Sequence, residues 1–121
     1  PAFGMPEGMF AEDEIANGLH GGELETSLML HLRPDLVRRD ALRDFAAPAA
    51  RPGALLGPER PVGYAWSSQD LNPAGAMGNA LRADAARGSR AIAHFGERLA
   101  ALLRETASMP LASLRDGPGE C

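Results

Sequence analysis

The stretch that decides the local fold is HGGELETSLMLHL, which runs from His20 to Leu32. Two glycines directly after the histidine remove side-chain bulk and permit backbone angles that other residues rarely adopt. Leucines then recur every four positions, at residues 24, 28 and 32, a spacing that predicts a helix over residues 22–32 with one apolar stripe. Pro34 disfavours helical backbone at the residue before it, so we expect the helix to end there.

Two carboxylates crowd the first turn of this predicted helix. Exposed backbone N–H groups at a helix N-terminus favour negative charge, which accounts for both Glu23 and Glu25 in the simplest interpretation. Leu24 is predicted to face inward, so we expect the neighbouring Glu23 to stay in water. Glu25 has a second possible role, because it could reach back to the imidazole of His20 or to a backbone N–H, as in a capping arrangement.

His20 is placed to project from a loop beside a helix N-terminus. Amides exposed at such a terminus bind anions or a carbonyl oxygen, and an imidazole there is suited to proton transfer near neutral pH. The alternative is a structural or incidental histidine. His31 and His94 fall inside predicted helices, and no metal-ligand spacing such as HExxH occurs. The sequence therefore predicts no metal ligands in this chain.

A second amphipathic helix is predicted from about Leu81 to Ser108. Its apolar residues fall at spacings of three and four: Ile92, Phe95, Leu99, Leu102 and Thr106, with Leu103 alongside. Gly88 and Gly96 interrupt it at about 1 kcal/mol each, a cost tolerated where another element packs closely.

Shorter elements are predicted elsewhere in the chain. A helical turn is expected over residues 11–18, closed by Gly18, and another over residues 39–45. Residues 46–62 hold four prolines and two glycines and are expected to form a loop. Residues 62–71 are expected to form a short strand or an extended loop.

Composition limits the classes of function. A chain of 121 residues fits one small domain, and its net charge of -4 argues against nucleic acid or an anionic membrane as a partner. No apolar run approaches the roughly 20 residues that a membrane-spanning helix needs. A lone cysteine at position 121 cannot form an internal disulfide, so we expect a cytoplasmic protein. With aromatics at only 5%, the core would be modest, which suggests an incomplete folding unit.

Two further groups have open interpretations. Arginines cluster over residues 33–43, at positions 33, 38, 39 and 43, where a solvated face is the default and a subunit contact is the sharper alternative. Tyr64 and Trp66 could stack on a ligand, although aromatics so placed more often serve packing.

Two separated blocks resemble the creatininase (creatinine amidohydrolase) family. They are LHGGELETSLMLHLRPDLVRRD and YAWSSQDLNPAGAMGNALRADAARGSRAI, in the family's order, and the resemblance extends from Phe3 to Leu111. It implies an α/β fold in which residues 1–121 are the C-terminal part of a single three-layer αβα domain, helix-rich in isolation. Residues 1–111 would match the family and residues 112–121 would be a frayed tail. The apolar stripes of both helices would cover a parallel sheet formed mostly by the N-terminal half.

The resemblance also implies an activity. Family members are metal-dependent amidohydrolases with a dinuclear zinc or manganese centre, and its ligands come from the N-terminal half. The chain alone is therefore expected to be inactive, and its expected partners are a small-molecule amide, the missing half or a companion chain, and further copies in a homohexamer. His20 and Glu25 would be the catalytic residues of this chain. The substrate-binding residues would be Ala16, Asn17, Gly18, Leu19, His20 and Gly21.

Departures from creatininase itself bear on the substrate. Leu19 stands where creatininase has a glutamate, and no tryptophan lies near the loop. The resemblance therefore implies hydrolysis of another amide, cyclic or open, or of a formamide. Two alternatives remain open: a non-catalytic truncated or split relative that binds a partner through its helices, and a free-standing helical binding module.

Overall fold

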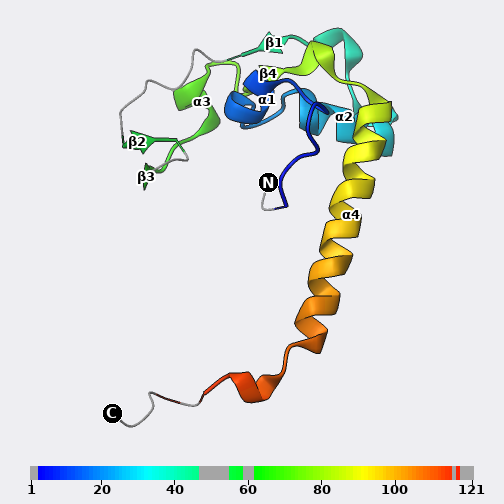
Figure 1. The fold of residues 1–121 in the computed structure, drawn as a ribbon. Coiled ribbons are helices and arrows are strands. Elements are labelled where there is room, and N and C mark those ends of the chain that lie inside the picture. Colours follow the sequence, from blue (N-terminus) through cyan, green and yellow to red (C-terminus); the bar gives the residue numbers. More distant parts are fainter. Residues whose placement is uncertain (1–2, 47–54, 59–61, 116, 118–121) are drawn as a thin grey trace.

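The computed structural model describes residues 3–46, 55–58, 62–115 and 117, which form a head of short elements at the start of one long helix (Figure 1). The helices are α1 (Glu12–Asn17), α2 (Glu23–Leu32), α3 (Ser68–Leu71) and α4 (Ala85–Ser108). The strands are β1 (Asp44–Phe45), β2 (Leu56–Gly57), β3 (Val62–Gly63) and β4 (Gly78–Asn79). Single 3-10 turns span Pro34–Leu36, Arg39–Ala41, Ala80–Arg82 and Leu111–Ser113.

The predicted helices are confirmed, with one shifted boundary. Both α1 and α2 lie where the sequence places them, and α2 ends at Leu32, two residues before Pro34. The long helix begins at Ala85 rather than near Leu81, because the preceding residues form a 3-10 turn. Asp84 then caps α4 by accepting a hydrogen bond from the N–H of Ala86, 2.9 Å away.

Two small sheets give the described part a mixed α/β character. Strand β1 pairs with β4 in antiparallel register, Asp44 with Asn79 and Phe45 with Gly78, and β2 pairs with β3 in parallel. The predicted helical turn over residues 39–45 is therefore wrong in its second half, where the backbone extends to pair with β4. Residues 62–71, predicted as a short strand or an extended loop, begin as strand β3 and end as helix α3. Each element covers only part of the segment.

Helix α2 packs against α4, and two of the five buried apolar residues that the structure describes, Leu30 and Ala91, come from these helices; the other three are Phe10, Met77 and Ala80. The buried residues of α2 are Glu23, Ser27 and Leu30, and those of α4 are Gly88 and Ala91. A Cβ added at Gly88 would overlap the backbone of Ser27, so the helices approach as closely as their main chains allow. This close approach needs small side chains on both helices.

The buried face of α2 is therefore not the face that the sequence predicted. Leu24 and Leu28 are only half-buried and Leu32 is 57% exposed. The close crossing selects the face that carries Ser27, and none of the three leucines is among the buried residues of α2. A hydrogen bond of 2.9 Å from the N–H of Asp84 to Oγ of Ser27 fixes this crossing at the start of α4.

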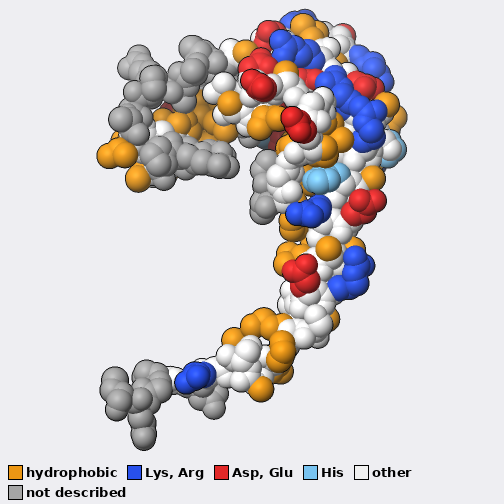
Figure 2. All heavy atoms as spheres, viewed as in Figure 1, with side chains coloured by type: hydrophobic (Ala, Val, Ile, Leu, Met, Phe, Trp, Pro, Cys, Tyr) orange, Lys and Arg blue, Asp and Glu red, His pale blue; other side chains and the backbone are white. Residues whose placement is uncertain are grey.

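The second half of α4 and the residues after it project from the head as an arm, which comprises residues 96–115 (Figure 1). Apolar side chains are exposed along it and at its end (Figure 2). They are Leu99, Leu102, Leu103, Met109, Leu111 and Leu114, each at least 46% exposed. The described residues place nothing within 4 Å of a Cβ built at Gly96. The predicted close packing is thus confirmed at Gly88 and wrong at Gly96.

Parts of two predictions lie outside the described residues. They are residues 47–54 and 59–61 of the predicted loop, and residues 116 and 118–121 of the predicted tail. Within the segments that the structure does describe, none of the helices combines the length and the apolar character needed to cross a membrane.

Candidate functional site

His20 lies in a short loop that is anchored on both sides. Its backbone forms an antiparallel bridge with Met77: the N–H of Met77 donates to the carbonyl of His20 at 2.6 Å, and the reverse bond is 3.4 Å. Gly21 adopts a φ of +70°, which an L side chain would strain, and so turns the chain into α2. The His20 side chain remains 59% exposed, which leaves its imidazole open to a ligand.

Glu25 reaches back to this loop from the first turn of α2. One oxygen, Oε2, lies 3.5 Å from Nδ1 of His20, and the same oxygen accepts a hydrogen bond from the N–H of Gly21. Glu25 is the third residue of α2, so this contact resembles a capping box displaced by one residue. The two predicted catalytic side chains are therefore neighbours, with Nε2 of the imidazole left for other partners.

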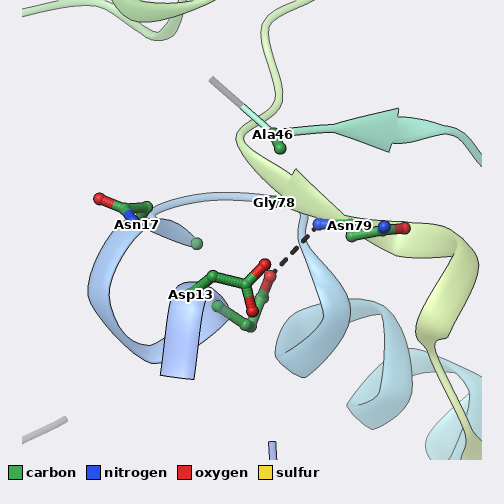
Figure 3. Close-up of a pocket in the computed structure, with 7 residues that line it drawn as sticks. Asp13, Asn17, Ala46, Gly78 and Asn79 are labelled. Atoms are coloured by element: carbon green, nitrogen blue, oxygen red, sulfur yellow. Dashed lines mark hydrogen bonds between the residues drawn. The ribbon is translucent and has the colours of Figure 1, made fainter. Parts of the chain in front are cut away.

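Glu14 also enters this region, and sequence reasoning did not single it out. The side chain is 94% buried, since the residue retains 6% of its accessible surface. One carboxylate oxygen accepts from the N–H of Leu24 at 3.1 Å, and the other accepts from the N–H of Asn79 at 3.3 Å, the bond dashed in Figure 3. The only sequence signal was the acidic start of α1, where Glu14 is indistinguishable from its exposed neighbours.

These contacts revise one expectation about the helix terminus. An open N–H group there could bind a substrate oxygen. The N–H of Gly21 is taken by Glu25, and that of Leu24 is taken by Glu14. Neither amide is open to a substrate in this arrangement.

A small cavity of about 140 Å³ lies beside α1 and β4 (Figure 3). It is lined by Asp13, Glu14, Asn17, Gly18, Ala46, Gly78 and Asn79. Of the six residues predicted to bind substrate, Asn17 and Gly18 line it. Of the other four, Ala16 belongs to α1, and Leu19, His20 and Gly21 lie in the loop that follows it; all four are outside the lining of this cavity.

The prediction about Glu23 is wrong. This residue was expected to stay in water, yet it is only 1% exposed and forms an ion pair with Arg87 of α4. The guanidinium of Arg87 also lies 5.4 Å from the ring centre of Phe10. A partner 64 residues away in the sequence makes burial of this charge tolerable.

The structure also describes the arginine cluster of residues 33–43 and the aromatic pair Tyr64 and Trp66. All four arginines are exposed, and Arg33 pairs with Asp35 through a 2.9 Å hydrogen bond. That guanidinium holds the pKa of the Asp35 carboxyl below its usual value. Trp66 donates from Nε1 to the carbonyl of Pro58 at 2.8 Å, and Tyr64 is exposed.

The described part of the chain was predicted to contain no metal ligands. Across residues 3–46, 55–58, 62–115 and 117, no group of three or more His, Cys, Asp or Glu side chains could hold a metal ion. The predicted catalytic pair supplies one imidazole and one carboxylate, fewer ligands than a zinc or manganese site requires. These residues do not form a metal centre.

Residues 1–103 of this chain match a family model of amidohydrolases. The matched region includes the histidine–carboxylate pair at the glycine-rich start of α2. That model is creatininase, described as creatinine amidohydrolase, and the chain belongs to the creatininase family. The predicted resemblance is confirmed. No curated protein and no solved structure matches the chain.

Proposed function

We propose that this chain supplies the His20 side of the active site of a metal-dependent amidohydrolase. The reaction is hydrolysis of the C–N bond of an amide, cyclic or open, or of a formamide. Family membership indicates an amidohydrolase-type function. The observation that carries the specific proposal is the contact of 3.5 Å between His20 and Glu25 in a loop that leaves the imidazole exposed.

The chemistry assigned to His20 is proton transfer. Hydrolysis adds water to the carbonyl carbon and breaks the C–N bond, and one proton from that water must reach the leaving nitrogen. Because Nδ1 faces Glu25, Nε2 is the atom of His20 that would carry this proton. Glu25 fixes the orientation of the ring through this contact.

The loop around His20 is assigned to substrate binding. Residues 16–21 comprise the last two residues of α1 and most of the loop that leads into α2. Asn17 and Gly18 line the cavity, and the bare backbone at Gly21 lets a small ligand approach the imidazole. A substrate held by this loop would meet His20 from the solvent side.

The metal ligands are assigned to another stretch of polypeptide, a preceding half or a companion chain. The described residues of this chain do not form a metal centre. The exposed leucines of the arm are suited to pack against further structure, such as the sheet of a three-layer αβα domain. We place the complete protein in the cytoplasm, as a homo-oligomer.

Reconstitution tests this function. The chain is produced alone and together with a segment that carries the family's metal ligands, and each preparation is assayed with zinc or manganese against a panel of amides and formamides. We expect turnover only when both parts are present. Turnover by the chain alone, or none by a folded and metal-loaded assembly, would contradict the proposal.

The exposed arm supports a second candidate, a non-catalytic relative that binds a partner through its helices. Six large apolar side chains are exposed on residues 96–115. This candidate predicts that the arm associates with a partner while the assembly hydrolyses no amide. The same reconstitution therefore separates the two functions.

A further inference from the structure

We propose that Glu14 is a positioning residue that caps α2 from a distance and so fixes His20. This inference rests on the proposed function of His20, because positioning matters only if the imidazole acts on a substrate. Glu14 has no assigned role in the proton transfer itself. Its carboxylate would act through the backbone on which His20 is carried.

The first argument is where the two carboxylate oxygens bind. One accepts from Leu24, the second residue of α2, and the other accepts from Asn79 in β4. His20 lies between these elements, since its backbone is bridged to Met77, the residue just before β4. A single carboxylate therefore ties together the helix that follows His20 and the segment that pairs with it.

The second argument is the space around the carboxylate. A Cβ built at Gly18, Gly22 or Gly78 would overlap the carboxyl group of Glu14. Gly18 and Gly22 stand two residues before and two residues after His20. The loop thus lies directly against Glu14 on both sides of the histidine, and both glycines leave room for the carboxylate.

The third argument is that the N-cap residue of α2 has no capping side chain. Its N-cap is Gly22, which has no side chain to accept a hydrogen bond, and Ser, Thr, Asp or Asn usually fills this position. Glu14 supplies the missing acceptor from α1. An acidic side chain at position 22 could do the same locally, but only if Glu14 were removed to make room.

This exclusion gives a compensation test, carried out on the metal-loaded assembly. The variants are Glu14→Ala, Gly22→Asp and the two together, with Glu12→Gln as the control for removing a charge from an exposed position of α1. The measurements are hydrogen–deuterium exchange of the peptide covering residues 18–28 and the separate values of kcat and KM.

Each single substitution should speed exchange in this peptide by about tenfold, the effect of losing about 1.4 kcal/mol of local stability. It should also lower kcat by about tenfold to a hundredfold, as expected for a displaced catalytic group, with KM within about twofold. The double variant should recover both values toward the parent. Glu12→Gln should change neither.

Unchanged exchange and kcat in Glu14→Ala would overturn the inference. A double variant as impaired as the product of its singles would overturn it as well, because recovery is expected only if Gly22→Asp takes over the cap. An inactive parent assembly would refute the proposed function instead. In that case the exchange data still decide whether Glu14 caps α2.

Discussion

The crossing of α2 over α4 can be tested with two glycines of the same helix. Gly88→Ala would push a methyl group into the carbonyl of Ser27 and the N–H of Leu28, which are backbone atoms that cannot rotate away. Gly96→Ala adds the same methyl group where the described residues leave open space. Both changes favour helix by about 1 kcal/mol, so this effect cancels between them.

The magnitudes follow from these surroundings. Overpacking costs about 1–3 kcal/mol, and the upper end applies because main chain meets main chain. We therefore expect Gly88→Ala to lower the free energy of unfolding by about 2 kcal/mol and Gly96→Ala to raise it by about 1 kcal/mol. Urea unfolding of the assembly, followed by circular dichroism at 222 nm, measures both. Equal effects from the two substitutions would refute the close crossing.

Two other predictions concern charge. Arg87→Met should lower the free energy of unfolding by about 3 kcal/mol, because it leaves the buried Glu23 carboxylate without its cation. The control Arg90→Met, at an exposed site, should change the free energy of unfolding by under about 0.5 kcal/mol. Urea unfolding curves that are the same for the two variants would show that the ion pair is unimportant. The pKa of the Asp84 carboxyl is held below its usual value, chiefly by the hydrogen bond from the N–H of Ala86. A lowered folded-state pKa adds stability above the unfolded pKa of about 3.9 and loses it as pH falls through the folded value, so the parent should lose stability relative to Asp84→Asn below about pH 4. A stability difference that stays constant from about pH 6 to pH 2 would contradict this, because the unfolded carboxyl titrates within that range.

The helices could be predicted because their signals are local. Pro34 ends α2, and the three- and four-residue spacing of apolar side chains marks α4. The contact between Glu25 and His20 was also accessible, since a capping carboxylate returns to the residues just before its own helix. These features depend on neighbours within about five residues.

The buried face of α2 was not predictable in the same way. Four-residue spacing selected the leucines, whereas the crossing selects Ser27 because only a small side chain fits opposite Gly88. Glu23 is buried through Arg87 and Glu14 is buried among three glycines, two of them near His20 and one beyond residue 70. Long-range partners of this kind leave no periodic pattern in the sequence.

The most direct measurement of the central claim compares two histidine substitutions in the metal-loaded assembly. His20→Ala should lower kcat for amide hydrolysis by about a hundredfold to ten-thousandfold with the metal content unchanged, because the leaving nitrogen loses its proton carrier. His31→Ala, at an exposed position of α2, should leave kcat near the parent value. Undiminished turnover in His20→Ala, with metal bound as in the parent, would contradict the account.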